Sequence, residues 1–206
     1  NEVQNIAPNY VSNSKLTYIN NKALIFEGGN EYHNFDISSV YAVGRGVDRI
    51  TFNGNYYEAL LFPDKIQRGN YLHDFDVNGR FIINNQDAFG DVHTESDYIR
   101  VQVTLPAQRP FFDGQLYLGG EFNYNLTDQN SVMRYDNELA AYTQTLLLKQ
   151  GGYNYQYWFI PKGATKATVQ RVDGSYWQTK NEYTVYVYHR EWGARYDKLV
   201  GVNFSE

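Results

Sequence analysis

The chain has 206 residues, no cysteine and a net charge of -5 at pH 7. The lack of cysteine excludes disulfides, thiolate metal sites and cysteine nucleophiles, and the acidic balance argues against non-specific nucleic-acid binding, which needs a basic face. No run approaches the ~18 apolar residues of a membrane helix. The 20 tyrosines, 12 phenylalanines and 17 glycines favour strands and turns over helices, so we expect an all-β fold.

The first half of the chain predicts short strands separated by turns. The start, Asn1-Glu2-Val3-Gln4, lacks the pattern of a signal peptide, so none is expected in this chain. A β-hairpin is predicted over residues 48–62, because Asn53-Gly54 is a strong turn signal between two β-prone runs. Residues 85–97 are polar, acidic and rich in turn formers. We place a domain boundary there, so that residues 1–95 form an N-terminal β-sandwich domain. A long loop inside one sandwich is the alternative.

The second half alternates more strictly between apolar and polar residues. Ile99, Val101, Val103 and Leu105 alternate with polar side chains, and a further strand is predicted over residues 183–189. Strands at this spacing, with turns between them, predict that residues 96–206 form an immunoglobulin-like β-sandwich domain. The expected architecture is therefore two β-sandwich domains in tandem.

The stretch over residues 146–159 is the strongest structural signal in the chain. An apolar run ends before Gly151 and Gly152, and four aromatic residues then occupy alternate positions: Tyr153, Tyr155, Tyr157 and Phe159. We expect a β-hairpin in which the glycines, Gly152 above all, adopt positive φ at the turn. Four large rings on one face of the second strand should point into the core.

Motifs of known chemistry are absent from the sequence. It has no nucleophile elbow, phosphate-binding loop, dinucleotide fingerprint or zinc-protease motif. Asp74, Asp76 and Asn78 precede a glycine as in a calcium loop, but Asn85 stands where a bidentate Glu is needed. The histidines lack metal-ligand spacing, and we expect them at the surface or at strand edges: His33, His73, His93 and His189. We therefore predict no catalytic, cofactor or metal site, and a protein that is not an enzyme.

Two groups of residues are candidates for binding. Near the C-terminus, charges of both signs alternate with rings, and the candidates for a protein-docking surface are Arg190, Trp192, Arg195 and Tyr196. Arg, Trp and Tyr dominate binding hot spots, although a solvated return strand would have the same pattern. Trp158 and Trp177 are either packed rings or flat platforms that stack sugars.

Several stretches, taken together and in their order along the chain, resemble the plug protein family of the Bacteroidetes type IX secretion system. They are residues 28–36, 76–81, 95–98, 147–155, 181–185 and 195–201. The resemblance implies a non-enzymatic, periplasmic β-protein associated with the outer membrane, without a cofactor and without inserting into the membrane itself. Its implied partner is an outer-membrane translocon, which it binds and occludes from the periplasmic side. The chain corresponds to the C-terminal part of such a protein.

The second half also resembles glycogen-binding modules, which are early-set immunoglobulin-like domains. Residues 120–125 keep Gly120, Phe122 and Asn123 of one module motif but lack its tryptophan, and residues 152–157 keep the second motif. The alternative function implied is a carbohydrate-binding module that stacks α-glucans on exposed aromatic rings, here Trp158 or Trp177.

Overall fold

The structure is a computed structural model that describes residues 2–66, 71, 73–74 and 76–205. The strands, in chain order, are β1 (Tyr10–Ser12), β2 (Lys15–Thr17), β3 (His33–Asp36), β4 (Val47–Phe52), β5 (Tyr57–Leu61), β6 (Phe81–Ile83), β7 (Tyr98–Pro106), β8 (Gly114–Gly119), β9 (Arg134–Asp136), β10 (Ala141–Lys149), β11 (Gly151–Pro161), β12 (Tyr183–His189) and β13 (Lys198–Ser205). The helical elements are short: η1 (Lys22–Leu24), α1 (Val92–Glu95) and η2 (Glu121–Asn123). The prediction of an all-β fold with sandwich architecture is confirmed.

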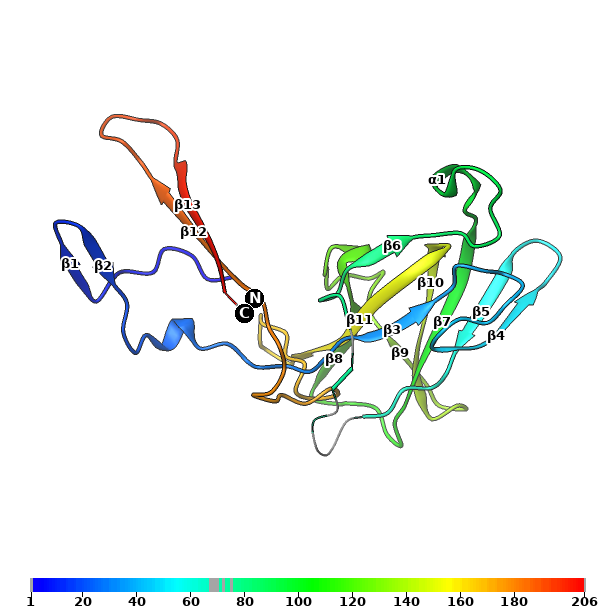
Figure 1. The fold of residues 1–206 in the computed structure, drawn as a ribbon. Coiled ribbons are helices and arrows are strands. Elements are labelled where there is room, and N and C mark those ends of the chain that lie inside the picture. Colours follow the sequence, from blue (N-terminus) through cyan, green and yellow to red (C-terminus); the bar gives the residue numbers. More distant parts are fainter. Residues whose placement is uncertain (1, 67–70, 72, 75, 206) are drawn as a thin grey trace.

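Strands β3 to β11 form a two-layered body (Figure 1). One sheet has the order β4-β5-β7-β10-β9. The other is built on β11, which pairs with β3 and β6 along its first half and with β8 along its second half. Apolar side chains from both sheets form one buried cluster between the layers. The body therefore has a single core shared by its two sheets.

The strongest alternations in the sequence do mark inward faces. Ile99, Val101, Val103 and Leu105 of β7 are completely buried, and the four rings of β11 are at most 4% exposed. The hairpin predicted around Asn53-Gly54 is confirmed, because β4 and β5 pair antiparallel on either side of that turn. Apolar alternation at period two thus identified the strands that hold the body together.

The predicted boundary between residues 95 and 96 does not separate two sandwiches. Strand β5, before the boundary, pairs in parallel with β7, so that Ala59 lies opposite Val101. Strands β3 and β6, also before it, flank β11, and Phe35 and Phe81 both lie opposite Tyr153. The strands of residues 1–95 are short, and Phe35 of β3 and Ala59 of β5 are buried where these strands join the long strands β11 and β7. The alternative, a loop inside one sandwich, describes residues 85–97 better.

The predicted hairpin at residues 146–159 is a crossover between sheets. β10 and β11 do not pair with each other, and the chain passes from one sheet to the other at Gln150, which is buried. The Gln150 N–H donates to the carbonyl of Asp97 at 2.9 Å. Gly151 has φ +157°, and a Cβ there would lie 2.0 Å from the carbonyl oxygen of Ile82. Gly152 does not have positive φ, so that expectation is wrong: glycine is needed at 151, for close approach of two backbones.

Two hairpins, β1–β2 and β12–β13, project from the same side of the body (Figure 1). The strand predicted over residues 183–189 is confirmed as β12, but it pairs with β13 alone among the described strands. It leaves the body instead of completing an immunoglobulin-like sandwich within residues 96–206. We call the β12–β13 hairpin with its connecting loop, residues 183–205, the arm.

A polar junction holds the base of the arm against the body. The side chain of Asn181 donates to the carbonyl of Gly28 at 2.8 Å, and the Thr179 hydroxyl donates to the carbonyl of Gly29 at 2.9 Å. The Tyr176 N–H donates to the same Gly29 carbonyl at 2.8 Å. A Cβ on Gly28 would lie 2.2 Å from the carbonyl oxygen of Tyr176, so the two segments approach as closely as backbones can. The chain entering the body and the chain leaving it are thereby tied together.

Candidate functional site

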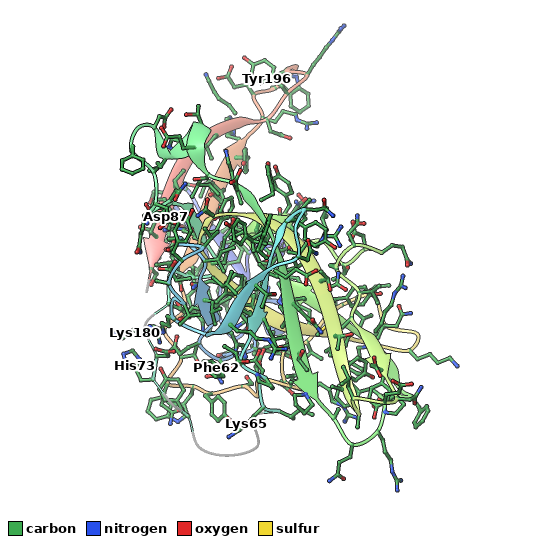
Figure 2. All side chains as sticks on the ribbon, turned by 90° about the vertical axis from the view of Figure 1, so that its right-hand side faces the viewer. Phe62, Lys65, His73, Asp87, Lys180 and Tyr196 are labelled. Atoms are coloured by element: carbon green, nitrogen blue, oxygen red, sulfur yellow. The ribbon has the colours of Figure 1, made fainter. Side chains whose placement is uncertain are left out.

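The loop at the end of the arm contains all the residues predicted to dock a partner. Arg190, Trp192, Arg195 and Tyr196 lie between β12 and β13, and each is exposed. Figure 2 shows Tyr196 at the outer end of the arm, away from the body. We call residues 190–197 the arm tip. The structure therefore gathers the four predicted residues on one projecting loop.

An ion pair closes the arm tip. The Arg190 guanidinium donates to both carboxylate oxygens of Asp197, at 2.9 and 2.7 Å. Hydrogen bonding and the charge of Arg190 hold the pKa of Asp197 below its usual range. Lys198 lies 3.5 Å from Glu191 across the base of the loop. Arg190 is paired with Asp197, so its role is to hold the shape of the loop. The other three predicted residues, Trp192, Arg195 and Tyr196, are the exposed groups that could contact a partner.

One face of the arm is apolar along its length. Tyr186 lies opposite Val202, Thr184 opposite Phe204, and Tyr188 opposite Leu199, so these side chains share a face. We call these residues the apolar arm face. The apolar side chains among them are exposed, Tyr186 by 56% and Phe204 by 66%, whereas Thr184 is half-buried. A two-stranded hairpin is only marginally stable alone in water, and its edges offer unpaired backbone groups.

A largely buried charged cluster lies in the body. His33 sits between two aspartates, with Nδ1 at 3.1 Å from Asp64 and Nε2 at 2.8 Å from Asp173. The hydroxyls of Tyr155 and Tyr157 donate to Asp64 at 2.7 and 2.5 Å. The carboxylate of Asp173 is completely buried and also accepts the Tyr157 N–H at 3.1 Å. His33 is half-buried at the start of β3, an edge strand among the described strands, so of its two expected places it takes the strand edge and not the open surface.

The two carboxylates keep His33 charged. Burial alone favours the neutral ring, but the charge and hydrogen bond of Asp173, joined by those of Asp64, raise the pKa of His33 to about 10. Burial also opposes the charged form of Asp64, yet the hydrogen bond and charge of His33 hold the pKa of that carboxyl below its usual range. Both ring nitrogens are engaged, so the cluster ties β3, the chain after β5 and the turn at Asp173 to β11.

Part of this cluster had a signal in the sequence. His33 and Phe35 occupy alternate positions of β3, and Phe35 is buried, so His33 belongs to the same inward face. Its partners come from turns far along the chain, and no local pattern marks them. A lone inward histidine indicates that its ring nitrogens need hydrogen-bond partners, but not which residues provide them.

The acidic residues considered for calcium contact protein groups. Asp74 lies 2.6 Å from Arg45, and Asp76 accepts the backbone N–H groups of Tyr32 and Asn78 at 2.5 and 3.0 Å. Within the described residues no group of three His, Asp or Glu side chains is arranged to hold a metal ion. In the same part of the chain, no helix has the length and hydropathy to cross a membrane.

The two candidate sugar-stacking rings differ in access. Trp158 is half-buried on β11, and its indole lies over Gly119, where a Cβ would be 3.2 Å from the ring. Its Nε1 is buried without a hydrogen-bond partner among the described residues. Trp177 is 89% exposed. Neither ring lines the shallow polar hollow beside β10, whose walls include Asn123 and Arg134. Of these two rings, Trp177 is the open one.

A solved structure is similar to this chain over most of its length. It is a hypothetical protein from Parabacteroides merdae ATCC 43184, with 41% sequence identity and a TM-score of 0.91. The match covers 96% of this chain and 50% of that one, so the chain spans about half the length of its neighbour. No protein-family model and no curated protein matched the sequence.

Proposed function

We propose that this protein is a non-enzymatic accessory of protein secretion, which binds an outer-membrane translocon from the periplasmic side and occludes it. The observation that carries the proposal is the arm tip. It places Trp192, Arg195 and Tyr196, residue types that dominate binding hot spots, on a loop that projects from a compact body. The identity of the partner rests on the family resemblance of the sequence.

The mechanism is steric. A body with one continuous core and an internal ionic cluster is a rigid mass that can fill an aqueous opening. The junction at Gly28 and Asn181 fixes where the arm leaves that mass. Docking of the arm tip on the translocon would then position the body over the opening, and release of the tip would clear it. No step of this mechanism needs a catalytic group.

The charged cluster supports a non-enzymatic role. A general acid or base needs a proton-accepting or proton-donating atom that a substrate can reach. Here the two nitrogens of His33 contact Asp64 and Asp173, and the tyrosine hydroxyls donate to Asp64. These groups satisfy one another inside the body, as in a structural ion cluster.

The test is a pull-down from detergent-solubilised outer membranes of the native host. The tagged protein, expressed as its gene encodes it, should recover a very large barrel translocon that mass spectrometry identifies. Trp192→Ala together with Tyr196→Ala should abolish recovery, whereas Phe112→Ala, which removes a ring 83% exposed on the body, should not. Recovery that is absent, or that is equal for the two variants, would contradict the proposal.

The alternative, binding of α-glucans, now depends on Trp177. Titration with maltooligosaccharides should change tryptophan fluorescence if the ring stacks a sugar, and Trp177→Ala should remove the change. A fluorescence response that survives Trp177→Ala would exclude stacking on this ring. A response that it abolishes, together with a failed pull-down, would favour the sugar-binding role.

A further inference from the structure

The apolar arm face raises the question of what covers it. Its rings and aliphatic side chains lie on a two-stranded hairpin, where the described residues form no second layer over it: Tyr186, Tyr188, Leu199, Val202 and Phe204 are 44–66% exposed. Contiguous apolar surface of this kind marks an interaction site. On the opposite face Val185 lies opposite Asn203, and Val187 lies opposite Gly201.

The arm is held in place at its base. The ring of Tyr183 packs on Phe26 at 5.9 Å, and Glu182 lies 3.8 Å from Arg80. The arm is longer than the 4% of the chain left outside the match with the Parabacteroides protein. Part of the arm therefore lies within the match. The base of the arm is thus held, whereas its apolar face has no support from a second layer among the described residues.

The solved neighbour provides a source for that support. This chain covers 50% of it, so about as much chain again lies outside the match. We propose that the apolar arm face packs against further chain of the same polypeptide, in a longer form like that of the neighbour. The arm then joins two parts of one molecule, while the arm tip stays free. This interface is separate from docking on a translocon, and it exists without that partner.

Thiol labelling tests the proposal, because these 206 residues contain no cysteine. The polypeptide is expressed as its gene encodes it and purified without membranes, with the parent protein as the blank. Tyr186→Cys and Val185→Cys place a thiol on the apolar arm face and on the opposite face; the two native side chains are equally exposed, at 56%. We expect the thiol from Tyr186→Cys to react with a maleimide roughly tenfold or more slowly than that from Val185→Cys.

A second pair keeps the result independent of one site. Phe204→Cys should be protected relative to Asn203→Cys, which lies on the opposite face. Equal rates in both pairs would overturn the proposal, and so would a gene that encodes no chain beyond these residues. Protection that weakens on dilution would overturn it in favour of a second copy. Because no translocon is present, the result is independent of the pull-down.

Discussion

The body and the arm are built from the same kind of strand but bury it differently. In the body, the ring of Phe35 stacks on Tyr153 at 5.3 Å, and Phe81 stacks on the same ring at 5.5 Å. In the arm, Tyr186 and Tyr188 also have cross-strand partners but remain exposed. Alternation therefore specifies a strand, whereas burial depends on a second layer that the strand cannot specify. The difference separates the part of the molecule that buries its own apolar side chains from the part that leaves them exposed.

The difference in stability between the body and the arm should be largest when an ion pair is broken in each. Asp173→Ala removes a fully buried carboxylate and leaves the charge of His33 with one partner fewer, so we expect a loss of about 3–5 kcal/mol in the free energy of unfolding. Asp197→Ala breaks the exposed pair with Arg190 and should leave that free energy unchanged. Urea denaturation of the two variants measures both. Equal losses would mean that the cluster does not stabilise the body.

The charge of His33 should make the body weaken at high pH. Its pKa is raised from 6.5 to about 10 on folding, so the folded state holds a proton that the unfolded state releases. The stabilisation is complete below pH 6.5 and is lost as the pH rises toward 10, by an amount on the order of a few kcal/mol. Denaturation at several pH values should show this fall in the parent and a flatter profile in His33→Gln. If stability falls equally with pH in the parent and in His33→Gln, the loss cannot be assigned to the charge of His33.

The crossover between sheets should depend on Gly151 and much less on its neighbour Gly152. Gly151→Ala places a Cβ 2.0 Å from the Ile82 carbonyl oxygen, so the two strands must separate, and we expect a loss of about 2–3 kcal/mol. Gly152→Ala meets only the Ile82 Cγ2, at 3.5 Å, and should cost about 1 kcal/mol or less. Thermal unfolding of the two variants compares them directly. A larger effect at Gly152 would restore the hairpin-turn interpretation.

The smallest effect is expected on the arm. In the 206-residue chain, Phe204→Ala should change the free energy of unfolding by no more than about 0.5 kcal/mol, because the ring is 66% exposed. Phe159→Ala, which removes a ring that is 4% exposed, should cost about 3–5 kcal/mol. Both are read from urea titrations. A clearly larger effect of Phe204→Ala in a longer polypeptide would sharpen the case for a covered arm face.

Local patterns in the sequence predicted the strands well. The inward rings of β11, the buried stripe of β7 and the Asn53-Gly54 hairpin all follow from period-two alternation and turn chemistry. The arm tip could also be predicted, because Arg190 to Tyr196 is a short run between two strands. These features depend on residues that are neighbours in the chain.

These local patterns could not predict which distant strands pair with each other. A glycine pair after an apolar run is equally consistent with a tight turn and with a backbone crossing close to Ile82, and the second holds here. The division at residue 95 failed because the turn-rich segment is a loop between strands of shared sheets. The cluster around His33 was missed because Asp64 and Asp173 are brought to it only by the folded sheets.

The position of β11 in the chain determines when the body can fold. Strands β3, β6 and β8 all precede β11, and each pairs with it. During synthesis these three strands emerge without that partner, and their sheet must wait for residues 151–161. Folding of this kind has a high contact order and is slow. Ribosome-bound chains that end at residue 150 should therefore be digested readily by protease, whereas chains that extend past the arm should resist. A body assembled around this late strand cannot close its core until residues 151–161 have been made.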